Sequence, residues 1–318
     1  MNSPMIWKPA AASDAIPTLD AFAERWLADQ APVWKRSHAR TVRESLAFWI
    51  LPSLGSWQMD AIGRADLMAL RAWMHAHPRH PSPARINKVM GILVALLREG
   101  MLRHDLPDVT AGMRALAVPE PAISPFSLTD VTRLLTHLDA PWSDYFALRF
   151  FTGLRTGEVD GLQWEDVDLT ARRLTVRRAW VDGAWETPKS RAGYRDVILV
   201  GRACDALARQ QARTGKRGML VFATARGTPL NRRNVTCRVW YPALDALGLA
   251  RRRAYQTRHT YATLMLAAGE NVEFIRQQMG HRDARVLFTR YARYVPDLTR
   301  RDGSAMDALL NQSAQGAG

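Results

Sequence analysis

Two arginines lie where a guanidinium group could take part in chemistry. Arg258 stands near the start of YQTRHTYATLMLAAGE, residues 255–270, where a basic stretch leads into an apolar helical run. Arg155 lies in FTGLRTGEVDGL, in the turn between a helix that ends at Gly153 and a second helix that begins near Glu158. A guanidinium fork matches the geometry of a phosphate group. The two positions therefore suggest either a surface that binds nucleic acid or a reaction centre.

Three further side chains are candidates for chemistry, each with an ordinary alternative. Lys189 lies in the loop ETPKSRAGYR after a hairpin strand, where an exposed turn lysine is the simpler interpretation. His281 directly follows Gly280, which ends the helix NVEFIRQQMG. Tyr291 lies near the end of a helix in DARVLFTRYARYVP that Pro296 terminates, and a single tyrosine on a helix usually serves packing. Taken one at a time, none of them identifies a function.

A DNA-binding protein without catalysis is one alternative. The helix that carries Arg258 ends at Gly269, and a second helix begins near Asn271. Two short helices around a glycine are typical of a helix-turn-helix, which reads DNA without chemistry.

A metal-dependent nuclease is the second alternative, because two-metal enzymes need clustered carboxylates. The acidic segment GLQWEDVDL predicts a helix end that leads into a strand, which turns its acids to different sides. The histidines of HAHPRH, residues 75–80, are expected in a solvated turn. We therefore predict no metal site. The clustered acids are Glu158, Asp160, Glu165, Asp166 and Asp168.

The charge of the chain points to a polyanion as its partner. The net charge is +14, the isoelectric point is near 10.6, and only five of the 44 basic residues are lysines. With 318 residues, 47% of them hydrophobic, about two domains with real cores are expected. No apolar run reaches the roughly 18 residues of a spanning helix, and no secretory leader is visible. Two cysteines without CxxC spacing predict reduced thiols. We expect a cytoplasmic protein without cofactor.

Residues 18–105 predict a helical bundle. The segments TLDAFAERWLADQ, SHARTVRESLAFWILPSLG, RADLMALRAWMHA and SPARINKVMGILVALLREG each carry the apolar spacing of an amphipathic helix. In the last segment Pro83 marks the start and Gly100 the end. Residues 106–125 have no sustained period and contain four prolines, which predicts a linker between domains.

The second domain begins at residue 126 with a capping pattern, Ser127 to Asp130. Helices are predicted through WSDYFALRFFTG and near GEVDGL, after which RRLTVRRAW alternates as one strand. Asp182-Gly183 supplies a tight turn, and GAWETP and YRDVILV give two more strands before helices resume at RACDALARQQA. This order predicts a mostly α fold with a small antiparallel sheet, an α+β class.

Together and in this order, the candidate residues resemble the signature of the tyrosine recombinases, the phage-integrase family. That signature is an arginine in a TGLRxGE box, a lysine on a β-hairpin, an HxxR box, a GH dipeptide and a tyrosine shortly after it. The segments LPSLGSWQMDAIGRADL and INKVMGILVALLREG are similar to the family's helical core-binding domain, so the resemblance covers most of the chain. The corresponding residues are Arg155 in Thr152 to Glu158, Lys189, Tyr255 to Arg258, Gly280-His281, and Tyr291.

The resemblance implies a site-specific DNA recombinase or integrase that cuts and rejoins strands through a 3′-phosphotyrosyl intermediate, without metal or ATP. Tyr291 would be the nucleophile. Arg155 and Arg258 would stabilise the charge that grows on the phosphate oxygens. Lys189 would protonate the leaving 5′ oxygen. His281 would bind the scissile phosphate or help to accept the tyrosine proton.

Tyr255 stands where the family has the histidine of its HxxR box. A phenol with a pKa near 10 donates a hydrogen bond at neutral pH but is a poor proton shuttle, so we expect Tyr255 to position a phosphate oxygen. His259 lies next to Arg258, but a helix turns about 100° per residue, so His259 is not expected simply to replace the missing imidazole. The resemblance also implies that Glu158 orients a catalytic side chain. The substitution at 255 leaves open a catalytically silent DNA-binding regulator on the same fold.

The resemblance implies double-stranded DNA as substrate, a homotetramer on two duplexes, and accessory DNA-bending proteins as partners. It implies a core-DNA-binding, SAM-like domain at 18–105, a linker at 106–125, a catalytic domain at 126–300 and a tail at 301–318. The tail either docks onto a neighbouring protomer through Asp307 to Leu310 or frays. The residues before the first helix are expected to be too few for a separate arm-site-binding domain. The basic residues expected to hold DNA in the helical domain are Arg40, Arg43, Arg85 and Lys88.

Overall fold

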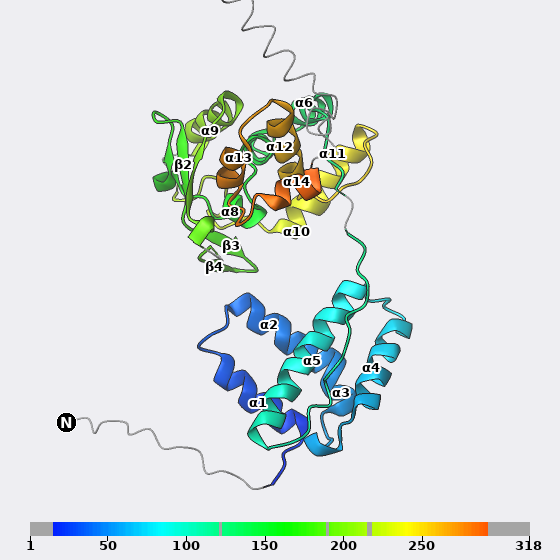
Figure 1. Cartoon of the computed structure of the whole chain (residues 1–318). Coiled ribbons are helices and arrows are strands. Elements are labelled where there is room, and N and C mark those ends of the chain that lie inside the picture. Colours follow the sequence, from blue (N-terminus) through cyan, green and yellow to red (C-terminus); the bar gives the residue numbers. More distant parts are fainter. Residues whose placement is uncertain (1–14, 121–122, 189–190, 215–217, 292–318) are drawn as a thin grey trace, which may run out of the picture. The chain divides into compact units, whose positions relative to one another are not determined.

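The structure is a computed structural model of the 318-residue chain, and it describes residues 15–120, 123–188, 191–214 and 218–291. The chain divides into two compact units, Met1–Pro121 and Ala122–Gly318 (Figure 1). Within the described residues no helix is long and apolar enough to cross a membrane.

The first unit is the helical bundle predicted from residues 18–105. Its first helix buries Leu19, Phe22, Ala23 and Trp26, which is the stripe that the apolar spacing predicted. The second predicted helix runs on through a π-helical stretch into a third short helix, so the chain turns only at Gly55. The elements are α1 (Leu19–Gln30), α2 (Arg36–Ser45), η1 (Leu46–Ile50), α3 (Leu51–Leu54), η2 (Met59–Ala61), α4 (Arg64–Ala76) and α5 (Pro83–Arg103).

The prediction that α5 ends at Gly100 was wrong, because the helix continues to Arg103. Gly100 is buried where the helix passes close to two core side chains. A Cβ at this position would lie within 3.2 Å of the Phe22 ring and closer still to Met59. The glycine therefore permits close packing inside the helix and does not terminate it.

The segment after α5 is held on the first unit. Leu106, Val109, Met113 and Leu116 pack against its hydrophobic core. The Asn87 side chain on α5 donates a hydrogen bond to the carbonyl oxygen of Leu116 (2.9 Å) and accepts one from the Leu116 amide (2.8 Å). The proline-containing stretch predicted as a linker from residue 106 therefore follows the bundle at least as far as Leu116.

The second unit combines helices with two small antiparallel sheets, and its first helix is capped by Ser127 as predicted, through a bond from the Asp130 amide (3.0 Å). The strand order of the larger sheet is β1-β2-β5, and β3 pairs with β4 alone. Its helices are α6 (Leu128–His137), α7 (Trp142–Thr152), α8 (Thr156–Asp160), η3 (Trp164–Asp166), η4 (Arg191–Gly193), α9 (Gly201–Thr214), α10 (Arg232–Val235), η5 (Thr236–Trp240), α11 (Tyr241–Ala246), α12 (Gln256–Ala267), α13 (Val272–Met279) and α14 (Arg285–Tyr291). Its strands are β1 (Val167–Asp168), β2 (Arg173–Val176), β3 (Ala179–Val181), β4 (Ala184–Glu186) and β5 (Arg195–Ile198).

The single strand predicted over RRLTVRRAW is in fact two strands, β2 and β3, in different sheets. The chain leaves the larger sheet at Arg177 and Arg178, which form ion pairs with Asp166. The hairpin β3–β4 then packs against α8, where a Cβ at Gly157 would lie 2.7 Å from the carbonyl oxygen of Trp180. The predicted three-stranded sheet was therefore wrong in its membership, while the mostly helical α+β class is confirmed.

The close approach at Gly100 leads to a testable difference within one helix. Replacing Gly100 by Val should destabilise the protein by about 1–3 kcal/mol, because the added carbons meet the buried Met59 and Phe22. Gly91→Val in the same helix is the matched control, since a Cβ there meets nothing within 4 Å. Urea unfolding followed by tryptophan fluorescence measures both. Equal stabilities of the two variants would contradict the packing role.

Candidate active site

Arg155 sits at the turn between α7 and α8, as the sequence predicted, and Glu158 holds it there. The amide of Arg155 donates to Oε2 of Glu158 (2.8 Å), and its Nη1 donates to Oε1 (2.9 Å). The Arg155 side chain remains 41% exposed. One carboxylate thus caps the first turn of α8 and fixes the direction of a guanidinium group that still reaches solvent.

A second arginine shares the same carboxylate. Arg195, the first residue of β5, donates from Nη2 to Oε2 of Glu158 (2.9 Å) and from Nη1 to Oε1 (3.2 Å). Its Nε donates to the carbonyl oxygen of Gln278 (2.7 Å), so it also connects β5 with α13. Arg195 was not among the residues predicted from the sequence. It alternates with Val197 and Leu199, whose side chains are buried, and a charge on an apolar strand face signals a buried partner.

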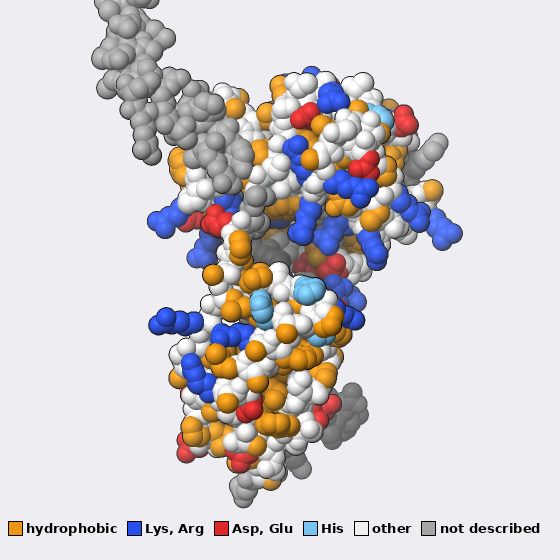
Figure 2. All heavy atoms as spheres, turned by 90° about the vertical axis from the view of Figure 1, so that its right-hand side faces the viewer, with side chains coloured by type: hydrophobic (Ala, Val, Ile, Leu, Met, Phe, Trp, Pro, Cys, Tyr) orange, Lys and Arg blue, Asp and Glu red, His pale blue; other side chains and the backbone are white. Residues whose placement is uncertain are grey.

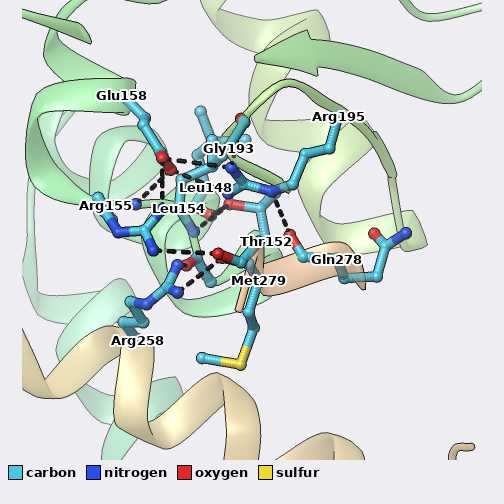
Figure 3. Close-up of polar contacts among 12 residues, drawn as sticks. Leu148, Thr152, Leu154, Arg155, Glu158, Gly193, Arg195, Arg258, Gln278 and Met279 are labelled. Atoms are coloured by element: carbon cyan, nitrogen blue, oxygen red, sulfur yellow. Dashed lines mark hydrogen bonds and ion pairs between the residues drawn. The ribbon is translucent and has the colours of Figure 1, made fainter. Parts of the chain in front are cut away.

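Arg258 is fully buried in the first turn of α12 and links the ends of two other helices. Its Nη1 donates to the carbonyl oxygen of Gly153 (2.5 Å), just after α7, and its Nη2 donates to that of Met279 (2.6 Å), the last residue of α13. Figure 3 shows the guanidinium groups of Arg155, Arg195 and Arg258 pointing into one region beside Glu158.

This region carries more positive charge than its protein partners neutralise. Burial alone would raise the pKa of Glu158, but the charges and hydrogen bonds of Arg195, with Arg155 and Arg258, lower it to about 2. Burial and the charge of Arg155 lower the pKa of Arg258 to about 10. Three guanidinium groups surround one carboxylate, and such excess charge favours binding of an anion.

His281 lies at the same place because Gly280 turns the chain there. Gly280 ends α13 in the left-handed region (φ 64°), its carbonyl oxygen accepts a hydrogen bond from Nη2 of Arg155 (3.2 Å), and a Cβ would lie 2.9 Å from the carbonyl oxygen of Ala192. Burial, followed by the charges of Arg258 and other arginines, lowers the pKa of His281 to about 3. Its Nδ1 is buried and has no hydrogen-bond partner among the described residues, and the imidazole is neutral at pH 7.

Tyr291 is 2% exposed at the end of α14, and its hydroxyl lies 2.8 Å from Nδ1 of His259. Burial raises the pKa of Tyr291 to about 12, although the charge of Arg258 opposes this. Burial, with the charges of Arg290 and Arg258, lowers the pKa of His259 to about 4. A neutral phenol and a neutral imidazole therefore face each other at neutral pH.

Tyr255 precedes α12, with 43% of its surface exposed, and its ring meets the ring of His259 edge-on at 5.2 Å. His259 was not expected simply to replace the histidine of the HxxR box, because it lies one residue from Arg258. Position 259 lies four residues after position 255, and residues four apart lie on the same face of a helix. His259 therefore lies one turn below Tyr255 and beside Tyr291.

A buried network supports both arginine-bearing segments from behind, and it too was missed. Arg149 on α7 donates from Nη2 to the hydroxyl of Thr156 (2.9 Å) and to the carbonyl oxygen of Ala254 (2.9 Å). Its Nη1 donates to the hydroxyl of Tyr145, which donates to Asp160 (2.8 Å). Burial raises the pKa of Asp160 to about 6. Arg149 thus joins the start of α8 to the residue before Tyr255.

Lys189 lies outside the described residues. Its described neighbours on the N-terminal side, Thr187 and Pro188, line a cavity of about 220 Å³ together with Arg155 and Glu158. The loop that carries the predicted lysine therefore begins beside the arginine cluster.

The acidic residues that suggested a metal nuclease form hydrogen bonds or ion pairs with different partners within the protein. Glu158 binds arginines, Asp160 binds Tyr145, Glu165 binds Arg178, and the Asp168 side chain accepts the Ala171 amide. Within residues 15–291, apart from the gaps named above, no group of three or more metal-binding side chains is placed to hold an ion.

The predicted DNA-binding residues of the first unit lie on two helices that pack together, α2 and α5. Arg40, Arg43 and Lys88 are exposed and Arg85 is half-buried. Arg40 forms an ion pair with Glu44 (3.7 Å). The structure therefore leaves these four side chains within reach of a ligand on the bundle surface.

Comparison with known sequences relates this chain to mobile-element proteins. The sequence profile of the phage integrase family matches residues 127–296. The "putative defective protein IntQ" of Escherichia coli K12 is 30% identical over 258 residues, 72% of this chain and 64% of that protein. The prophage integrase IntR of the same strain is 28% identical over 211 residues, 59% of this chain and 51% of that protein. The match thus spans between about half and two-thirds of these relatives.

Solved structures share the fold at low sequence identity. The Tn1549 transposon integrase in complex with a circular intermediate DNA has a TM-score of 0.75 at 17% identity, over 92% of this chain and 99% of that chain. A lambda integrase tetramer bound to a Holliday junction has a TM-score of 0.67 at 17% identity, over 85% of this chain and 79% of that chain. At these identities the likeness shows the fold alone.

The low pKa of Glu158 predicts how stability depends on pH. The folded protein holds the ionised form, so this stabilisation is complete above the ordinary pKa of 4.5 and is lost as the pH falls toward about 2. Glu158→Gln should cost about 3–5 kcal/mol at pH 7, because it leaves buried arginine charge unpaired. The difference from wild type should shrink between pH 4.5 and 2, as measured by urea unfolding.

Glu165→Gln is the matched control. The Glu165 carboxylate also pairs with an arginine but is 59% exposed, so its loss should cost less than about 1 kcal/mol. A Glu158→Gln variant that behaves like Glu165→Gln at pH 7 would show that the buried carboxylate does not organise the cluster.

Proposed function

This chain belongs to the phage integrase family of tyrosine recombinases, and we propose that it is a site-specific DNA recombinase that cuts and rejoins strands through a 3′-phosphotyrosyl intermediate. One observation carries the proposal: the guanidinium groups of Arg155 and Arg258 and the imidazole of His281 converge where buried positive charge exceeds negative charge. A phosphodiester supplies the missing negative charge, and Tyr291 lies beside this place.

In the proposed reaction the Tyr291 oxygen attacks the scissile phosphorus and forms a phosphotyrosyl ester while the 5′ oxygen departs. Arg155 and Arg258 stabilise the charge on the non-bridging oxygens, and both are already aimed by hydrogen bonds, so little reorganisation is needed. His281, beside these arginines, binds the same phosphate through its imidazole. Lys189 protonates the 5′ oxygen. Reversal of these steps joins strands without ATP.

Glu158 acts in this proposal by positioning. Its two oxygens hold Arg155 and Arg195 at once, which fixes one guanidinium group toward the substrate and the other toward the protein interior. Tyr255, exposed at the start of α12, donates a hydrogen bond to a phosphate oxygen.

The proposed substrate is double-stranded DNA, bound by four protomers on two duplexes, with accessory DNA-bending proteins as partners. Two structures of similar fold, the Tn1549 integrase with a circular intermediate DNA and a lambda integrase tetramer on a Holliday junction, support this assembly. Lys and Arg side chains outnumber acidic ones on the displayed face of the second unit (Figure 2), as a DNA-binding surface requires. The segment Asp307 to Leu310, proposed to dock in trans, lies outside the described residues. We place this activity in the cytoplasm.

A DNA-binding regulator without catalysis is the second candidate, and Tyr255 favours it. This phenol occupies the position where the family signature has a histidine, so a proton-transfer group is missing there. A regulator binds the same DNA and forms no covalent adduct.

A nicked suicide duplex separates these candidates. Wild-type protein should form a covalent protein–DNA adduct that resists denaturation and forms equally well in EDTA. Tyr291→Phe should form none, because it lacks the attacking oxygen. Arg155→Ala and Arg258→Ala should slow adduct formation by about 10²–10³-fold. Denaturing gel electrophoresis measures all of these.

Tyr241→Phe on α11 is the matched control, since it removes a hydroxyl that belongs to no part of the proposed site. It should form the adduct at the wild-type rate. Adduct from Tyr291→Phe would disprove the nucleophile, and DNA binding by wild type without any adduct would favour the regulator.

The basic residues of the first unit should determine how DNA binding depends on salt. Arg43→Ala and Lys88→Ala should each lower the slope of log K against log salt concentration by about 0.9, because each side chain neutralises one phosphate. Both should weaken target and non-target DNA equally. Fluorescence anisotropy at several salt concentrations measures the slopes. Arg103→Ala, whose guanidinium pairs with Asp29 and Glu99, is the control and should leave the slope unchanged.

A further inference from the structure

The hydroxyl of Tyr291 has a defined partner inside the protein. Nδ1 of His259 lies 2.8 Å from it, both residues are buried, and their rings are 5.6 Å apart. An imidazole at this distance is within reach of the proton that the tyrosine loses when it attacks a phosphate. The family signature in this sequence assigns no role to His259.

We propose that His259 is the proton acceptor for Tyr291 during strand cleavage and its proton donor during rejoining. This inference rests on the proposed recombinase function and adds a catalytic residue to it. His259 thus supplies, one helical turn after position 255, the imidazole that the substitution of tyrosine at 255 removes.

The helix geometry supports this assignment. Position 255 lies at the start of α12 and position 259 lies four residues later on the same face, with their rings in edge contact. A phenol, the group at Tyr255, is a poor proton acceptor because its oxygen already carries its proton at neutral pH. The charges of Arg258, Arg155 and Arg195 act on the His281 ring, which places it beside the arginine cluster. His259 is thus the imidazole in contact with the nucleophile.

The charges around His259 keep its acceptor nitrogen free. The groups that face it among the described residues are Tyr255 and Arg258 of the α12 segment, and Arg290 and Tyr291 of α14. Burial and the two arginines lower its pKa to about 4, so the ring is neutral at pH 7 and can accept the tyrosine hydrogen at Nδ1. The incoming DNA phosphates add negative charge, which favours the imidazolium that forms in the transition state.

The proton transfers of cleavage are reversed in rejoining, so no proton is gained or lost over the two half-reactions. In cleavage the Tyr291 O–H bond breaks, its proton goes to Nδ1 of His259, the oxygen bonds to phosphorus, and the 5′ oxygen leaves with a proton from the general acid, proposed as Lys189. In rejoining, the 5′ hydroxyl attacks phosphorus and returns its proton to that amine. The departing Tyr291 oxygen then takes back the proton from Nδ1.

Single-turnover cleavage of the suicide duplex tests the proposal with two substitutions. His259→Ala should slow adduct formation by about 10²-fold. His259→Asn places an amide oxygen near the Nδ1 position, so it can accept the hydrogen bond but cannot take the proton, and it should remain as slow as His259→Ala. Free imidazole should restore part of the His259→Ala rate. A wild-type rate in His259→Asn would overturn the proposal and leave a purely positional contact.

The pH profile and a modified substrate provide the second measurement. Wild-type cleavage should be nearly independent of pH between about 6 and 8, whereas His259→Ala should gain about tenfold per pH unit, because hydroxide must remove the proton. A 5′-bridging phosphorothiolate, whose leaving group needs no proton, should restore Lys189→Ala but not His259→Ala. Restoration of His259→Ala by that substrate would overturn the assignment.

Failure of the proposed recombinase function would give a different result from failure of the His259 assignment. If wild-type protein and Tyr241→Phe bind the duplex but form no adduct on either substrate, the recombinase proposal itself fails. Thermal unfolding and DNA affinity of the His259 variants should match wild type. If the His259 variants lost thermal stability and DNA affinity together with activity, and imidazole did not rescue them, His259 would be structural. That result would also overturn the proposal.

Discussion

One buried carboxylate organises the candidate site. Glu158 accepts hydrogen bonds from Arg155, three residues before it at the N-terminus of α8, and from Arg195, 37 residues after it at the start of β5. A buried charge of this kind is costly unless it is paired. The arginines around Glu158 carry more positive charge than this one carboxylate neutralises. The cluster therefore favours binding of an anion. The same interaction therefore connects two elements of the fold and leaves positive charge unpaired, which favours an anion.

The arginines also satisfy the ends of helices. Arg258 donates to carbonyl oxygens after α7 and at the end of α13, and Arg195 and Arg155 donate to those of Gln278 and Gly280. The last carbonyl groups of a helix have no partners within it and carry partial negative charge. Cationic side chains thus substitute for missing backbone partners. Because each guanidinium bridges two segments, the position of one depends on the others, and the site forms as a unit.

Much of this was visible in the sequence, because it depends on local spacing. The Ser127 cap, the turn at Arg155 and the glycine at 280 all act within a few residues. Arg195 was missed because its partner, Glu158, lies in a different element, and spacing along the chain does not encode that contact. The division of RRLTVRRAW depends on packing against α8, which is equally non-local. His259 was accessible in principle through the four-residue helical repeat.

The burial of Tyr291 has a consequence for the proposed attack on a phosphodiester. A reacting oxygen must come within about 3–3.5 Å of phosphorus, and a side chain that is 2% exposed does not offer that approach. In the described arrangement the Tyr291 hydroxyl is thus closed to a phosphate from solvent and is in contact inside the protein with Nδ1 of His259. Strand cleavage as proposed therefore requires a conformation in which this hydroxyl is more exposed while its contact with His259 persists.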